Sequence, residues 1–192
     1  ALIHTGIATA LVGLLAIIVA LSYDYGSYQL NKDLRYIFEG YWRIALWLLF
    51  LTYVLILSGA YVTRTGSSLA CQAIPLCGVP FAEMAEIQWN HMMHRLMAFV
   101  VFLIAVLVLF RARQIESVRI NNISKAMLYV LSVQILLGVG NVVMGLPSEL
   151  RALHLTTAAL FFAVCSALVG VLWGIKMYNL DNLTRGDSER HQ

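Results

Sequence analysis

Charged residues are scarce in this sequence, and their scarcity excludes most classes of soluble protein. Only 12% of the 192 residues are charged, whereas about a quarter are charged in an average soluble domain. Hydrophobic residues make up 60% of the chain, and its mean hydropathy is +0.79. The first apolar stretch also lacks the basic region and cleavage site of a signal peptide. The composition therefore indicates a polytopic membrane protein, and the net charge of +3 does not indicate a nucleic-acid partner.

Five apolar segments are each long enough to cross a bilayer, which takes about 20 residues. Because a backbone in lipid must satisfy its own hydrogen bonds, we expect these segments to be helices. The predicted fold is all-α, a polytopic membrane bundle of four transmembrane helices with one further helix before it. The predicted spans are Leu2–Tyr23, Arg43–Val62, Asn90–Phe110, Ile123–Met144 and Leu150–Met177.

A weak internal repeat suggests how these spans are organised. Ile3–Leu11 and Leu153–Leu160 both contain a histidine, small polar residues and the start of a long aliphatic helix. We therefore expect the first span to close a preceding bundle. Because the chain starts at Ala1 inside an apolar run, we also expect it to be part of a longer protein or a processed form. The predicted divisions are helix 1–23, cytoplasmic connector 24–42, bundle 43–177 with an outer loop 63–89, and a polar, irregular cytoplasmic tail 178–192.

The basic residues are divided unequally between the two sides of the membrane. Ten of them lie in the loops after the first and third spans and in the tail. Because Lys and Arg accumulate in cytoplasmic loops, we expect the cysteine-containing loop outside and the C-terminus in the cytoplasm. This predicts a multi-pass protein of the bacterial plasma membrane or an equivalent energy-transducing membrane. The three remaining basic residues, here called the outer arginines, are Arg64, Arg95 and Arg151.

Histidines occur at the outer ends of the predicted helices, beside the outer arginines. His4, His94 and His154 fall at similar depth, and Arg95 directly follows His94. An ionisable residue in a transmembrane helix is costly and therefore suggests a function. Two imidazoles on facing helices can bind a heme iron axially, and the outer arginines can bind its anionic propionates. The alternative is that these side chains only extend toward the lipid headgroups.

His91 lies one helical turn before His94 and shares its helix face. Only one of the two needs to be an iron ligand, and His94 is the better candidate because it lies deeper and adjoins Arg95. His91 is then a hydrogen-bond donor behind the ligand, a residue at the mouth of the site, or a helix cap. His4 and His91 are also candidates for a second heme or a substrate, whose other ligand would lie outside this chain.

Two of the three cysteines, Cys71 and Cys77, lie in the outer loop. In an oxidising compartment we expect a disulfide between them, and free thiols or a redox-active pair are the alternatives. Cys165 lies in the middle of a span and is expected to be a small core residue.

The fourth span contains polar and small residues on its apolar helix. Gln134 and Asn141 share one face and are expected to form hydrogen bonds between helices. Gly138 and Gly140 permit the close approach of another helix or of a flat macrocycle.

Several longer motifs resemble a known family. The outer loop and the histidine-arginine pair at the start of the third span are similar to those of the heme A synthase family, and so is the last helix pair. The similarity covers residues 43 to 175, in the same order and spacing. The motifs are Gly59–Cys77, Gln88–Arg95, Gln134–Gly138, and Leu146–Pro147 followed by His154.

The resemblance implies a fold, a cofactor and a reaction. Proteins of this family have eight spans in two similar four-helix halves, so this chain corresponds to the closing helix of the first half and the whole second half. In the family, the second half binds a b-type heme between two histidines that match His94 and His154. The first half binds heme O, and His4 matches one of its histidines. The reaction oxidises a methyl group of heme O to a formyl group, which gives heme A for cytochrome oxidase.

The sequence departs from the family pattern at two places. The first half of the family has a glutamate, taken as catalytic, three residues before its histidine-arginine pair, and His91 stands at that offset here. No glutamate lies in any predicted span, so the catalytic residues remain unidentified in this chain. The usual Pro-Asp-Trp between the loop cysteines is replaced by Gln-Ala-Ile-Pro. A missing N-terminal half or a second copy would then have to complete the catalytic site.

Two other functions stay open at this point. One is a non-catalytic b-type cytochrome, which would be an electron-transfer or assembly subunit of a respiratory complex. The other is a bundle without a cofactor, whose histidines are only interfacial. The expected partners are heme O, membrane lipid, and heme O synthase or cytochrome oxidase, with no nucleic acid.

Overall fold

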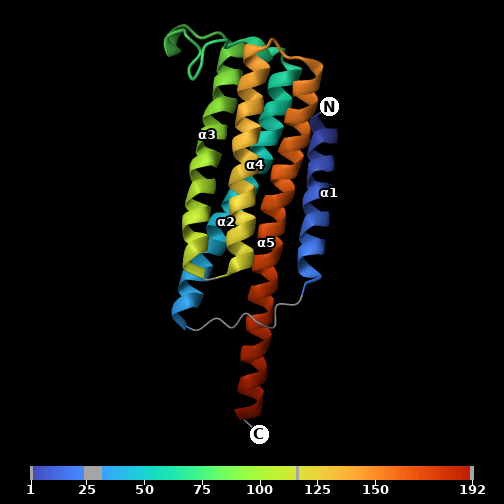
Figure 1. Ribbon diagram of the computed structural model, residues 1–192, viewed down its shortest axis with the longest axis vertical. Coiled ribbons are helices and arrows are strands. Elements are labelled where there is room, and N and C mark those ends of the chain that lie inside the picture. The colour runs from blue at the N-terminus through green and yellow to red at the C-terminus, as the bar shows by residue number, and fades with distance from the viewer. Residues whose placement is uncertain (1, 24–31, 116, 191–192) are drawn as a thin grey trace.

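The computed structural model describes residues 2–23, 32–115 and 117–190, and these residues form five long helices and three short 3-10 helices, with no β-strand among them (Figure 1). Each long helix is long and apolar enough to cross a membrane, which confirms the all-α polytopic fold. The long helices are α1 (Leu2–Leu21), α2 (Lys32–Arg64), α3 (Glu86–Ala112), α4 (Val118–Val143) and α5 (Ser148–Arg190), and the 3-10 helices are η1 (Ser67–Leu69), η2 (Phe81–Glu83) and η3 (Arg113–Ile115).

Helices α2 to α5 form a four-helix bundle, and α1 lies outside it along α5 (Figure 1). Within the bundle α2 and α4 each pack against both α3 and α5, so α3 and α5 are diagonally opposite. Glycines allow α1 to approach α5 closely. A Cβ on Gly13 would come within 2.5 Å of the Phe162 ring, and one on Gly170 within 2.7 Å of Ala20.

The apolar core fills the end of the bundle opposite the Cys71–Cys77 loop, here called the far end. Two polar contacts tie the helices together there: Tyr41 Oη lies 2.9 Å from Ser124 Oγ, and Lys176 Nζ lies 2.9 Å from a carboxylate oxygen of Glu39. Counted from the opposite end, called the disulfide end, the core begins at Leu48 on α2, Val101 on α3, Leu131 on α4 and Phe161 on α5.

The disulfide end of the bundle has a much looser interior. No side chain is buried along residues 53–61 of α2, 93–100 of α3, 132–140 of α4 or 150–160 of α5. Each of these stretches is about 12 to 16 Å long at the helical rise of 1.5 Å per residue. Side chains that face the interior at this end therefore keep partial exposure, whereas those at the far end are packed.

Four helices extend beyond the predicted spans, and the extensions are longest in α2 and α5. α2 begins at Lys32 rather than Arg43, so residues 32–42 of the predicted cytoplasmic connector are part of this helix. The reason is that Phe38 and Tyr41 are buried in the core, which stabilises this first part of the helix. The tail was expected to be irregular, whereas α5 continues to Arg190. The tail contains no proline, and extending an existing helix is much easier than starting one. Residues 24–31 of the connector and 191–192 of the tail lie outside the described residues.

Candidate functional site

His94 lies near the start of α3, at the disulfide end, and its imidazole contacts α2. Its Nδ1 lies 2.8 Å from Oγ of Ser58. Gly59, the next residue of α2, leaves room for the ring, because a Cβ at this position would lie 3.0 Å from Cε1 of His94. The ring is therefore positioned by a hydrogen bond and by the absence of a side chain on the neighbouring helix.

His154 has a similar position on α5 and contacts α4. Its Nε2 lies 3.2 Å from Nε2 of Gln134, and a Cβ on Gly138 would lie 3.2 Å from its Cε1. Asn141 donates from Nδ2 to the carbonyl oxygen of Leu150 at 3.3 Å. The predicted interhelical bonds of Gln134 and Asn141 are thus confirmed, and Gly138 faces an imidazole.

The two histidines point into the bundle from diagonally opposite helices, and each is only partly buried. Near His154, three buried atoms have no hydrogen-bond partner among the described residues: Nδ1 of His154, Oε1 of Gln134 and Oδ1 of Asn141. Buried polar atoms without partners are uncommon and call for an explanation. A ligand bound between the helices would explain these unpaired atoms.

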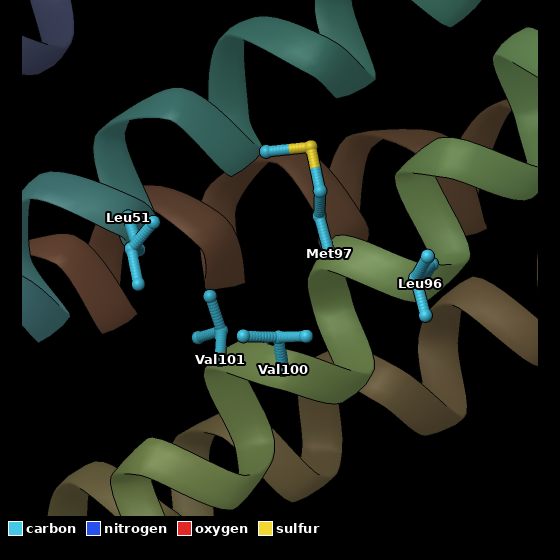
Figure 2. Close-up of a pocket in the computed structure, with 5 residues that line it drawn as sticks. All are labelled: Leu51, Leu96, Met97, Val100 and Val101. Atoms are coloured by element: carbon cyan, nitrogen blue, oxygen red, sulfur yellow. The ribbon is translucent and has the colours of Figure 1, made fainter.

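An apolar pocket lies between α2 and α3 on the far-end side of His94. Its volume is about 160 Å³. Met97 is one helical turn beyond His94, and its side chain extends from α3 toward α2 (Figure 2). The lining residues are Leu51, Leu96, Met97, Val100 and Val101. This wall is suited to an apolar group and offers no metal ligand stronger than a thioether.

The outer arginines have different surroundings. Arg95 reaches the disulfide loop, where Nη1 donates to the carbonyl oxygens of Ala73 at 2.7 Å and Pro75 at 3.2 Å, and Nη2 donates to that of Cys71. Three of the five N–H donors of this guanidinium are used in these bonds. Arg64 at the end of α2 and Arg151 in the first turn of α5 have exposed side chains.

Cys71 and Cys77 form the predicted disulfide, and Cys165 is a buried free cysteine in the core as expected. The disulfide packs on Met92 of α3. His91, directly before Met92, is 5% exposed, and its Nδ1 has no hydrogen-bond partner among the described residues.

The structure separates the remaining candidates. His94 and His154 point into the same part of the bundle, whereas His91 is buried close to the disulfide loop. His4 on α1 is exposed, outside the bundle. The longer helices bring Glu86 and Glu149 into the first turns of α3 and α5, where both side chains are exposed.

Sequence reasoning did not identify Ser58 and Gly59 as site residues. A serine and a glycine in an apolar helix are usually packing residues, and only the structure shows that they face His94. One signal was available in the sequence. Each histidine has a glycine on the span before its own, Gly59 before His94 and Gly138 before His154. A glycine on the preceding helix of each pair could have suggested a close neighbour.

Comparison with known proteins connects this site to a family. The family model described as cytochrome oxidase assembly protein matches residues 1–166. A segment of 62 residues, 32% of this chain, is 40% identical to part of the heme A synthase of Bacillus pumilus (strain SAFR-032). The matched segment spans 20% of the length of that relative.

Proposed function

The chain belongs to the heme A synthase family of cytochrome oxidase assembly proteins, and from this premise we propose that it binds a b-type heme between His94 and His154 and takes part in heme A synthesis. One observation supports this most directly. Two imidazoles, each against a glycine of the neighbouring helix, point into the one part of the bundle that has no packed core.

The residues present fit a heme. Imidazole nitrogens are common axial ligands of heme iron. Gly59 and Gly138 keep side chains away from both rings. The loose interior extends over two to three turns of each helix, about 12 to 16 Å. Unpaired polar atoms beside His154 also indicate that this interior is incomplete without a ligand.

Each of the chain's own residues has a defined part in this proposal. His94 and His154 hold the iron, and the exposed Arg64 and Arg151 at the disulfide end bind the propionates. Arg95 remains a candidate for the same role, but its bonds to three loop carbonyls support bracing of the disulfide loop instead. A heme with two imidazole ligands has no open position for oxygen and therefore supplies electron transfer.

The oxidation of the heme O methyl group needs a catalytic group that this site does not contain. His91 stands where the family's first half has its glutamate, and Glu86 and Glu149 are exposed at helix ends. We propose that an N-terminal half or another copy of the chain supplies the catalytic residue, with His4 part of a second heme or substrate site. The position of His91 also favours a second candidate function, a non-catalytic b-type cytochrome of a respiratory complex.

The orientation follows from the charges. Ten of the thirteen basic residues lie on the far-end side of the five helices, and the outer arginines lie at the disulfide end. The positive-inside rule then places the far end in the cytoplasm and the disulfide outside. This is consistent with a plasma-membrane protein whose loop cysteines are oxidised.

The function is tested in membranes of cells that make heme O. The hemes are extracted and separated by chromatography from cells that also make the N-terminal half, with this chain as wild type, His94→Ala, His154→Ala or Ser132→Ala. We expect heme A with the wild type and with Ser132→Ala, and its loss with both histidine variants. A protein that retains heme but forms no heme A would support the cytochrome instead. A protein without heme would contradict both functions.

A further inference from the structure

Ser58 is the only described residue that forms a hydrogen bond with the imidazole of His94. Its Oγ lies 2.8 Å from Nδ1 of His94 and 2.7 Å from the carbonyl oxygen of Leu55 on its own helix. A serine hydroxyl has one proton to donate and lone pairs with which to accept. A carbonyl oxygen can only accept, so Leu55 offers the Ser58 proton an acceptor on its own helix at 2.7 Å.

The proton assignment at Ser58 determines the tautomer of His94. A Ser58 hydroxyl that donates to Leu55 accepts at its other contact, and Nδ1 of His94 is then the N–H donor. A neutral imidazole has a proton on only one nitrogen. Nε2 of His94 therefore has a free lone pair, which is what an axial iron ligand requires.

Gly59 fixes the same ring sterically. A Cβ at Gly59 would lie 3.7 Å from each nitrogen of His94 and 3.0 Å from the Cε1 between them. The ring thus presents its Cε1 edge to Gly59 of α2, with Nδ1 on the neighbouring Ser58. Ser58 and Gly59 together set both the protonation pattern and the direction of the ring.

The hydrogen bond of His154 involves the other ring nitrogen, so the arrangement described for His94 is not repeated there. Its Nε2 is held at 3.2 Å by the side-chain amide nitrogen of Gln134. With the amide nitrogen of Gln134 as the donor, Nε2 of His154 accepts, and its Nδ1 has no partner among the described residues. In this pattern of hydrogen bonds the lone pair that would bind iron is engaged at His154 and free at His94.

We propose that Ser58 is a positioning residue that holds His94 in the Nδ1–H tautomer with Nε2 free to ligate the heme iron, an inference that rests on the proposed function. A hydrogen bond from the second ring nitrogen fixes the orientation of a ligating histidine and makes it more basic. A more basic ligand stabilises ferric iron. The Ser58 contact should accordingly lower the midpoint potential of the heme and strengthen its retention.

The test compares Ser58→Ala, Ser58→Thr and the control Ser132→Ala in the purified full chain. Ser132 also donates to a carbonyl of its own helix, at 2.9 Å from Leu128 O, and none of its described contacts involves a histidine. We expect Ser58→Ala to raise the midpoint potential and to weaken heme retention about tenfold, the lower range for residues that orient metal ligands. Ser58→Thr should restore both, and Ser132→Ala should match the wild type.

A second readout needs no heme. Nitrogen NMR of ¹⁵N-histidine-labelled protein without heme should show His94 as the Nδ1–H tautomer, and Ser58→Ala should give a mixture of tautomers. A wild type that takes up no heme would contradict the proposed function. Wild-type heme binding with an unchanged potential and tautomer in Ser58→Ala would contradict only the role of Ser58, as would an Nε2–H tautomer in the wild type.

Discussion

The α2–α3 pair and the α4–α5 pair each hold a histidine against a glycine, but a different ring nitrogen of each histidine forms the hydrogen bond. In each pair the ring on the second helix lies against a glycine of the first, Gly59 for His94 and Gly138 for His154. His94 bonds to Ser58 through Nδ1, whereas His154 is engaged by Gln134 at Nε2. Under the proposed function, His94 could bind iron through Nε2 as it stands, whereas His154 would first have to release the Gln134 amide. Similar steric settings thus do not make two ligands equivalent.

The connections between the helices differ as well. α2 and α3 are joined by a long loop that the disulfide and Arg95 brace. α4 and α5 are joined by a tight turn in which Gly145 and Leu146 have φ angles of 71° and 63°. The backbone conformation of the turn holds α4 next to α5, whereas side chains, namely the disulfide and Arg95, hold the loop between α2 and α3. The following changes test these differences in turn.

The largest effect is expected from filling the space beside the rings. Gly59→Val would force His94 away from its position, because even a Cβ would lie 3.0 Å from Cε1. We expect a loss of heme retention of about 100-fold, the upper range for disturbing a metal ligand's surroundings. Gly138→Val should act similarly on His154. The control is Gly40→Val, since a Cβ on Gly40 has no neighbour within 4 Å. Equal heme content in all three variants would contradict the common steric setting.

Arg95→Ala tests the bracing of the long loop. Each lost hydrogen bond contributes about 0.5 to 1.5 kcal/mol, so reduction of the disulfide by a thiol should become about tenfold faster. Arg111→Ala, an exposed arginine at the far end, is the matched control. The rate is measured by mass spectrometry of alkylated Cys71 and Cys77. An unchanged rate in Arg95→Ala would mean that its carbonyl bonds do not hold the loop.

Gln134→Met tests the contact between Gln134 and His154. Its effect on heme retention should be opposite in sign to that of Ser58→Ala. Methionine keeps a similar volume but cannot occupy Nε2 of His154. Removing a contact worth about 1 kcal/mol should strengthen heme retention roughly fivefold. Titration of heme into detergent-solubilised protein measures this. Weaker retention would show that Gln134 supports the bound heme rather than competing with it.

The smallest effect is expected at the tight turn. Gly145→Ala places a side chain at a φ of 71° and should destabilise the protein by about 1 kcal/mol. Gly40→Ala lies within a helix and should stabilise it by up to about 1 kcal/mol. Thermal unfolding in detergent compares the two variants with the wild type. A change of Tm in the same direction for both variants would contradict the left-handed conformation of Gly145.

Much of this arrangement could be predicted from the sequence, because it depends on composition and spacing. The apolar segments determine the helices, and the loop cysteines predict their disulfide. The depth of His94 and His154 along their segments places them at one end of the bundle. Gln134 and Asn141 on one helix face predict bonds between helices.

The remaining features depend on how the helices rotate against one another. Ser58 and Gly59 matter only because the rotation of α2 about its axis brings them against His94. The apolar sequence of α2 does not specify that rotation. The guanidinium of Arg95 bonds to backbone carbonyls, which every loop possesses. The first turns of α2 are polar in sequence, and only the burial of Phe38 and Tyr41 shows why they are helical.

The most direct test of the central claim is a reduced-minus-oxidised visible spectrum of the purified protein, recorded for the wild type, His94→Ala and His154→Ala. A low-spin b-type α-band in the wild type, lost or converted to high spin in both variants, is the predicted result for one iron between two imidazoles. A wild type without a heme spectrum, or a spectrum that neither variant changes, would contradict it.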